Sequence, residues 1–344
     1  TFQFLKPQKK ISGAVIIKDG LMEPFLAHSS AIVRLLSFSV LVSSPSPLRP
    51  LNLDTIRQIK TKLYIFYSET DVKSRNDILS ITKNLIERLR GSTAFLVKEI
   101  NTIKSQRDHC HNSNELKEPK SQDLLEKAEN LLRQQILFIA WFFRFLVEEL
   151  APTASYQRHV ASLKAITLWI SSGIIQETGN LSRVKSANHE IIWPCHIDFF
   201  IPETIRLLMD LLVNPYEDVR ALSSGILKMS SPCHIMRIGC SVPLKSDICE
   251  FVPVLNFDSD EPLRFLENFV KHVEEISDKT GRADYADGLA RSYELLYCLQ
   301  RCHQDQAKIL TNLLTKLYSK ISFAKQNLGQ AVQEAPLHGI LASI

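Results

Sequence analysis

Histidine and cysteine stand next to each other at four places in this sequence, and both residues are strong ligands for zinc. A zinc site needs paired ligands at a regular spacing, such as two cysteines two to four residues apart with a matching pair further along. None of the four places has that spacing, so we expect ordinary side chains there. They are His109-Cys110-His111, Cys195-His196, Cys233-His234 and Cys302-His303.

His196 and Asp198, beside Trp193, have the residue types of an acid–base pair. Such a pair also needs a nucleophile and a pocket, and the sequence has no serine or cysteine elbow motif. We therefore expect His196 to be a loop histidine in an aromatic cluster. Phosphate-cradling loops are missing too, since neither Gly-x-Gly-x-x-Gly nor a P-loop ending in Gly-Lys-Ser/Thr occurs. The sequence predicts no catalytic residue, no cofactor and no metal.

Positive charge is concentrated between Lys73 and Arg107, where the chain has eight basic residues and three acidic ones. Clustered lysine and arginine are the electrostatic footprint of a partner that carries phosphates. Only Phe95 is aromatic in this segment, so we expect contacts to a phosphate backbone rather than stacking on unpaired bases. A solvated helix face is the alternative interpretation. The candidate contacts are Lys73, Arg75, Lys83, Arg88, Arg90, Lys98, Lys104 and Arg107.

Helical periodicity dominates the elements that must position these residues. In residues 71–100 the apolar side chains recur at helical spacing and gather on one face, namely Ile78, Ile81, Leu85, Ile86 and Leu89. We expect Gly91 to bend or end this helix. Further helices are expected at 122–150, 155–172, 203–213, 215–230, 262–278, 284–301 and 304–325. Apolar runs typical of strands occur only at 14–17 and 251–255, and both are too short and isolated to make a sheet.

A nine-residue segment recurs without gaps: VRLLSFSVL at 33–41 aligns with VRALSSGIL at 219–227, and an apolar helix precedes each copy. This is the two-helix plan of HEAT and armadillo-type repeats, in which one helix pair cannot bury its apolar face alone and stacked pairs share a core. The sequence therefore predicts an all-α fold, an ARM/HEAT-like α-solenoid made of a superhelical stack of helix pairs. We expect Arg34 and Arg220 to pair with an acidic residue of the neighbouring repeat rather than to contact a ligand.

The predicted organisation has five parts: basic N-terminal helical repeats at 1–103, a polar loop at 104–121, central helical repeats at 122–230, an irregular insertion at 231–260 and C-terminal helical repeats at 261–344. Residues 1–120 contain 19 basic and 11 acidic residues, a net charge of +8, which leaves −4 for the rest. This asymmetry favours an anionic partner for the first third. With only 11 glycines in 344 residues, a nucleotide-binding α/β fold is disfavoured.

Seven cysteines, odd in number and scattered, indicate reduced thiols in an intracellular protein. The most apolar run, residues 136–143, is far shorter than a membrane span and indicates a buried helix. With no pattern of a signal peptide at 1–10, we expect a cytoplasmic protein without a membrane partner. Because Thr1 is not an initiator methionine and an apolar run leads to Ile344, we also expect a piece of a longer protein.

Residues 151–160, APTASYQRHV, resemble the Ser-Tyr-Gln-Arg segment of the thyroid adenoma-associated protein family. Other segments are similar in the same order, so the resemblance spans nearly the whole chain. They are the Val-Arg repeat at Val33, residues 75–90 ending in Arg-Leu-Arg, residues 216–227, ADYADGLARSYELL at 283–296 and Pro336-Leu337-His338-Gly339. The family's arginine-rich element is missing, since no two arginines are adjacent here, which is expected of a middle fragment whose key functional surface lies outside it.

The resemblance implies a function as well as a fold. Fungal members of that family are the non-catalytic partner subunit of a tRNA 2′-O-ribose methyltransferase. It follows that this chain would bind tRNA, with the basic residues of 73–107 as contacts, and position a separate catalytic 2′-O-methyltransferase subunit for modification of the anticodon loop. A general helical-repeat adaptor or scaffold for protein partners is the alternative. An activity of its own is disfavoured because a glycine-rich cofactor loop is missing.

Overall fold

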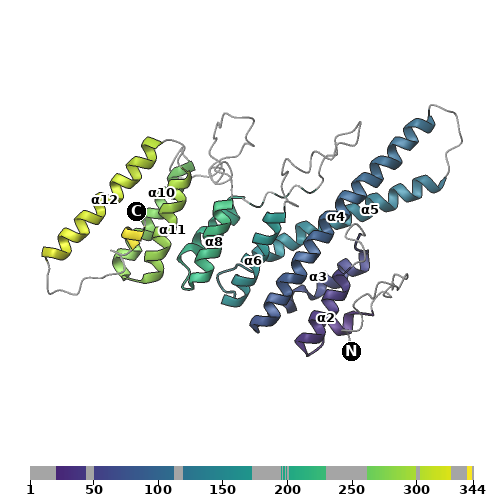
Figure 1. Cartoon of the computed structure of the whole chain (residues 1–344), viewed down its shortest axis with the longest axis horizontal. Helices are drawn as coiled ribbons and strands as arrows, with labels where there is room; N and C mark the ends of the chain where they lie inside the picture. The colour runs from purple at the N-terminus through teal and green to yellow at the C-terminus, as the bar shows by residue number, and fades with distance from the viewer. Residues whose placement is uncertain are drawn as a thin grey trace, which may run out of the picture. The chain divides into compact units, whose positions relative to one another are not determined.

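The computed structural model describes residues 21–43, 50–111, 119–172, 195, 197, 199, 201–229, 262–299, 303–326 and 339–342. Within these residues the backbone forms helices and no strand (Figure 1), which confirms the predicted all-α class. The short strands considered at 14–17 and 251–255, and the insertion expected at 231–260, lie outside the described residues.

The chain forms two compact units. Unit 1 comprises Thr1–Leu146 and Leu168–Ile197, and unit 2 comprises Val147–Thr167 and Asp198–Ile344. The helices are α1 (Glu23–Leu26), α2 (Ala31–Val42), α3 (Leu53–Tyr67), α4 (Val72–His111), α5 (Pro119–Glu148), α6 (Tyr156–Ser172), α7 (Pro202–Asp210), the 3₁₀ turn η2 (Leu211–Val213), α8 (Glu217–Met229), α10 (Pro262–Thr280), α11 (Ala283–Leu299) and α12 (His303–Gln326).

Helices α4 and α5 are longer than the sequence pattern predicted. The polar loop expected at 104–121 is wrong at both ends, because α4 continues to His111 and α5 already begins at Pro119. Helix α4 also runs through Gly91, where we expected it to bend or end. Ile100 of α4 and Leu125 and Ala128 of α5 form a buried cluster on either side of the polar segment. This packing holds the two helices together, and each helix continues from it into the polar segment, because extending a formed helix adds one hydrogen bond for each residue.

The core of unit 1 is built from aromatic rings. Phe142 of α5 meets Tyr67 of α3 and Trp169 of α6 edge to face, with ring centroids 6.3 and 5.4 Å apart. Trp169 has no exposed surface, and Phe138 and Phe142 are almost as deeply buried. The helix predicted at 136–143 is present, but it is buried on one face only, because Leu137 is 56% exposed. Edge-to-face contacts add specificity to the large apolar area that such rings remove from water.

The first copy of the repeat is held by Arg34, close to the start of α2. Its Nη1 donates hydrogen bonds to the carbonyl oxygens of His28 and Ser29, both at 2.8 Å, which fixes the turn between α1 and α2. Its Nη2 lies 2.5 Å from Oε2 of Glu69, just after α3. The expected pairing of this arginine with an acidic residue of the next helical element is confirmed.

The second copy, in unit 2, repeats this geometry at the same offsets in sequence. Nη1 of Arg220 donates to the carbonyl oxygens of Asn214 and Pro215 at 2.7 and 3.1 Å, six and five residues upstream as in the first copy. Nε donates to Oδ2 of Asp287 on α11 at 2.5 Å. Burial tends to raise the pKa of Asp287, but hydrogen bonds from Arg220 and Arg291 outweigh it and hold that pKa below its ordinary value. The aligned nine residues are thus a structural repeat.

Two glycines, Gly288 and Gly339, let neighbouring helical elements pack closely against each other. They lie in two of the segments that resemble the family, 283–296 and 336–339. A Cβ at Gly288 of α11 would lie 2.5 Å from the carbonyl oxygen of Leu212 in η2 and 2.9 Å from Cγ1 of Val213. A Cβ at Gly339 would lie 2.9 Å from both Cα and the carbonyl oxygen of Ala286. Both segments therefore need glycine because backbone atoms of a neighbouring element occupy the space of a side chain.

Replacing Arg220 should cost more stability than replacing a surface partner between the same two helices. Arg220→Ala removes a nearly buried guanidinium, leaves the carbonyl oxygens of Asn214 and Pro215 without this donor and leaves Asp287 with Arg291 alone, so we expect the free energy of unfolding to fall by roughly 2–4 kcal/mol. Lys228→Ala, which breaks an exposed pair with Glu294, should cost less than about 1 kcal/mol. Urea unfolding measures both. Equal losses would show that Arg220 does not hold α8 on α11.

Adding one methyl group should have opposite effects at two helical glycines. Gly288→Ala forces a methyl against backbone atoms that cannot move independently, so it should destabilise the protein by about 1–3 kcal/mol. Gly225→Ala is the matched control, because no atom lies within 4 Å of its added Cβ. There the higher helix propensity of alanine should stabilise by up to about 1 kcal/mol. Thermal unfolding compares the two, and a stabilising Gly288→Ala would contradict the close packing of α11 on η2.

Candidate nucleic-acid interface

The candidate basic residues lie on α4, whose opposite face is in the core. The apolar residues predicted to form one face are all buried, which confirms the helical pattern: Ile78, Ile81, Leu85, Ile86 and Leu89. Of the eight basic residues, Lys73, Lys83, Lys98 and Lys104 are exposed, and Arg75, Arg88 and Arg90 are partly exposed. Arg107 belongs to α4, but its side chain lies outside the described residues. The helix therefore presents most of this charge to solvent.

Arg88 is the member that the fold itself uses. Its Nη1 donates to the carbonyl oxygens of Leu41, Val42 and Ser43 at 3.1, 2.8 and 3.3 Å. Its Nη2 reaches the carbonyl oxygen of Pro50 at 3.4 Å. The last carbonyls of a helix lack partners within it and carry partial negative charge, so a guanidinium there is stabilising. Arg88 thus secures the end of α2 on α4.

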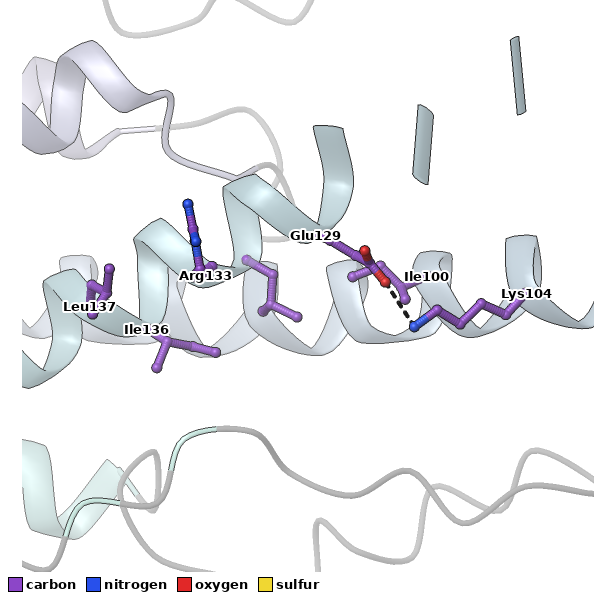
Figure 2. A pocket seen from close by; sticks show the side chains of 7 residues that line it. Ile100, Lys104, Glu129, Arg133, Ile136 and Leu137 are labelled. Atoms are coloured by element: carbon purple, nitrogen blue, oxygen red, sulfur yellow. Dashed lines mark ion pairs between the residues drawn. The ribbon is translucent and has the colours of Figure 1, made fainter. Parts of the chain in front are cut away.

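Two further members have partners within the protein. Nη1 of Arg75 donates to the carbonyl oxygen of Thr70 at 2.7 Å, near the start of α4. Nζ of Lys104 lies 2.8 Å from Oε1 of Glu129 on α5 (Figure 2). That pair borders an open groove of about 310 Å³ whose apolar lining comes from α4 and α5, with Arg133 also at its edge. Lys104 is exposed, so this pairing is weak and still leaves it accessible to a partner.

Lys83, Arg90 and Lys98 form a stripe along the solvent side of α4. Their spacings of seven and eight residues place them on one helix face, over a length of roughly 22 Å. In the described part of the chain, no carboxylate lies within ion-pair distance of any of the three. Glu87 lies between Lys83 and Arg90 on the same face, so the stripe is positive without being uniformly so. We refer to these three residues as the α4 stripe.

Sequence analysis missed the basic residues of α3. Arg57 and Lys60 are exposed one helical turn apart in unit 1, outside the segment 73–107. Their spacing of three residues is the signal that would have placed them together on one face. A count of charges along the chain does not reveal them, because acidic and apolar residues separate them from the denser run on α4.

The Ser-Tyr-Gln-Arg segment serves the structure of unit 2. Tyr156 Oη donates to Oδ2 of Asp218 at 2.6 Å, and its ring packs on Tyr216 with centroids 4.5 Å apart. Arg158 makes two hydrogen bonds to Glu149, whose side chain is only 9% exposed. Nε2 of the His159 ring forms a hydrogen bond with the carbonyl oxygen of Ala151 at 2.9 Å. These contacts join the end of α5, the start of α6 and the start of α8.

The candidates for metal and acid–base chemistry receive little support. Burial raises the pKa of the Cys195 thiol to about 12, although a hydrogen bond with Thr93 opposes this, so the thiol is a core group. His196, Asp198 and Trp193 lie outside the described residues, as do the side chains of the other His–Cys clusters. Among described residues, no three His, Cys, Asp or Glu side chains gather as metal ligands would. None of the described helices is long and apolar enough to cross a bilayer.

Comparison with known proteins gives a family and a relative. The family model described as "Trm732, TPR repeats" matches residues 5–221, well over half of the chain. The tRNA (32-2′-O)-methyltransferase regulator trm732 of Schizosaccharomyces pombe is 23% identical over 348 residues, which cover 98% of this chain and 20% of that protein. The chain therefore spans about a fifth of the length of this curated relative. No solved structure matches.

The family description specifies TPR repeats, whereas the sequence pattern led us to expect ARM/HEAT-like repeats. Both repeat types consist of stacked helix pairs, so the predicted helical-repeat class is confirmed. The family resemblance that we inferred from the Ser-Tyr-Gln-Arg segment and the other similar segments is confirmed as well. This chain belongs to the Trm732 family of TPR-repeat proteins.

Proposed function

We propose that this chain is a non-catalytic helical-repeat part of a protein that binds tRNA and positions a separate 2′-O-ribose methyltransferase for anticodon-loop modification. The observation that carries the proposal is its likeness, over nearly its whole length, to a relative named as regulator of a tRNA (32-2′-O)-methyltransferase. A cytoplasmic location belongs to the same proposal.

The α4 stripe supports the tRNA-binding part. Phosphates attract lysine and arginine most strongly where those cations reach solvent and have no carboxylate partner. Lys83 and Lys98 are exposed and Arg90 is partly exposed, and among the described residues none of the three has a carboxylate within ion-pair distance. They lie on a 40-residue helix, which extends over roughly 60 Å. A rigid row of cations of this kind suits contact with a phosphate backbone, and it needs no reading of base edges.

The non-catalytic part rests on how the polar residues are used. Arg34, Arg220 and Arg158, which a catalytic site could employ, are all engaged in ion pairs that connect helices. The sequence also has no glycine-rich loop for a methyl-donor cofactor. Stacked helix pairs supply long surfaces on which two macromolecules can be held side by side. A positioning role uses that property directly.

A scaffold for protein partners is the second candidate, and one observation favours it. Helix α12 exposes large apolar side chains, with Leu314 53%, Tyr318 75% and Phe323 62% exposed. Apolar side chains gathered on one exposed element are typical of surfaces that contact another protein. This candidate and tRNA binding use different units and are compatible with each other.

Reversing the charge of the α4 stripe should weaken tRNA binding. Each phosphate neutralised contributes roughly 0.7–0.9 logarithmic units of affinity per tenfold change in salt, because counterions are released. Replacing Lys83, Arg90 and Lys98 with Glu should therefore lower affinity and flatten the salt dependence by roughly two to three units per tenfold salt. Fluorescence anisotropy of labelled tRNA over a salt series measures both quantities.

The control carries the same charge change elsewhere. Lys271 and Lys279 of α10 and Lys325 of α12 are exposed lysines of unit 2. Their replacement with Glu should leave the salt slope nearly unchanged, apart from the small effect of net charge. If both triple variants weakened binding equally, long-range charge and not the α4 stripe would be responsible.

Deleting the gene should remove one modification without changing the methyltransferase itself. Because the proposed role is positioning, the 2′-O-methyl group at tRNA nucleotide 32 should be lost while the catalytic subunit is still present. Mass spectrometry of digested tRNA detects the modification, and the purified chain alone should neither bind S-adenosylmethionine nor methylate tRNA. Persistence of the modification in the deletion strain would refute the proposed function.

A further inference from the structure

A lysine and a partly exposed tryptophan meet between α3 and α5 of unit 1. Nζ of Lys60 lies 5.0 Å from the centre of the Trp141 ring. On α5, the rings of Phe138 and Phe145 lie nearly parallel to that of Trp141, with centroids 5.9 and 5.6 Å away. The tryptophan is thus braced by its own helix, and the ammonium group of another helix lies over it.

The exposed face of α3 around Lys60 is basic and aromatic. Arg57, Lys60 and Tyr64 follow one another at spacings of three and four residues, which places them on one face. Tyr64 is 57% exposed, so most of its ring contributes nothing to the core. The other exposed side chains of this face are Leu53, Thr61 and Ser68, and the one carboxylate at its edge, Asp54, is partly buried and accepts a hydrogen bond from Gln58. On α5, Arg144 is exposed one turn beyond Trp141.

We propose that Lys60, Tyr64 and Trp141 form a stacking site for an unpaired nucleotide of RNA, with Arg57 beside it for a flanking phosphate. Proteins that bind single strands combine aromatic rings, on which bases stack, with cations that follow the backbone. Both components are present here within one helical turn of each other. The α4 stripe lacks the aromatic component, so it suits a phosphate backbone alone.

Lys60 explains how the site can be stable when empty and still open to a base. An ammonium over an indole ring is favourable by cation–π attraction and shields the exposed ring from water. In the described residues Lys60 has no carboxylate partner to hold it in place. Its flexible side chain can therefore move to a phosphate when a base takes its position on the ring, so no charge is left uncompensated.

The inference depends on the proposed function only for the identity of the RNA, since an unpaired loop nucleotide of a tRNA would supply the base. The stacking chemistry itself needs any accessible single strand. A structured duplex bound at the same face is the competing possibility, and the experiment separates it from the proposal.

The test titrates the whole chain with a single-stranded RNA of about eight nucleotides, within the span that one such site covers, and with a duplex of the same length. Lys60→Ala and Tyr64→Ala alter exposed side chains, so both variants should fold. Loss of one stacked base should lower single-strand affinity by about 5- to 150-fold in Tyr64→Ala. Tyr318→Ala, at a 75% exposed tyrosine of unit 2, is the matched control and should bind normally.

Tryptophan fluorescence gives a second readout. The chain has two other tryptophans, Trp169 and Trp193. Trp169 has no exposed surface, and Trp193 is replaced with Phe in the protein used for this measurement, so quenching by the RNA should come from Trp141 and disappear when Trp141→Phe is added. Normal affinity in both Lys60→Ala and Tyr64→Ala, or equal affinity for the duplex, would overturn the stacking site. Failure of whole tRNA to bind, while the single strand still quenches Trp141, would refute the proposed function and leave the stacking site intact.

Discussion

A guanidinium group that leaves water needs hydrogen-bond acceptors and a counter-charge in exchange, and this constraint governs how one helix pair joins the next in this protein. Arg34 and Arg220 meet it in the same way. Each uses one nitrogen for the two carbonyls of the preceding turn and another for a carboxylate of a later helical element. Removing either partner would leave a buried charge, which costs more than the pair contributes. Turn, second helix and next element are therefore fixed together.

The basic residues fall into two groups, those that hydrogen-bond within the protein and those that face solvent. Arg88 and Arg75 donate to backbone carbonyls, whereas the lysines of α4 point to solvent with little to hold them. Arginine suits the first use, since its planar fork can satisfy several oxygens at once, and lysine suits the second. A surface that binds phosphates thus needs basic side chains that the fold does not engage in ion pairs. The α4 stripe and the face around Lys60 supply such side chains.

The sequence was sufficient to predict the helical class, the buried face of α4 and the pairing of both repeat arginines. The helical class and the buried face follow from local periodicity. The arginine pairs follow from the need of a buried arginine for a carboxylate. It was insufficient for the extent of α4 and α5, because the cluster of Ile100, Leu125 and Ala128 forms only when residues from two helices meet. It was also insufficient for Lys60 and Trp141, which are 81 positions apart and share no local pattern. Nor does a run of charges show that Arg88 lies at the end of another helix.

The two arginine pairs span very different lengths of chain. Arg34 reaches a carboxylate 35 residues away, and Arg220 reaches one 67 residues away. The entropy of closing a loop grows only with the logarithm of its length, so doubling the loop costs about 0.6 kcal/mol. That is small beside the contribution of a buried charged hydrogen bond. A repeat joined in this way can accept long insertions between the arginine and its carboxylate, so the period along this sequence can differ between the two copies while the joint stays the same.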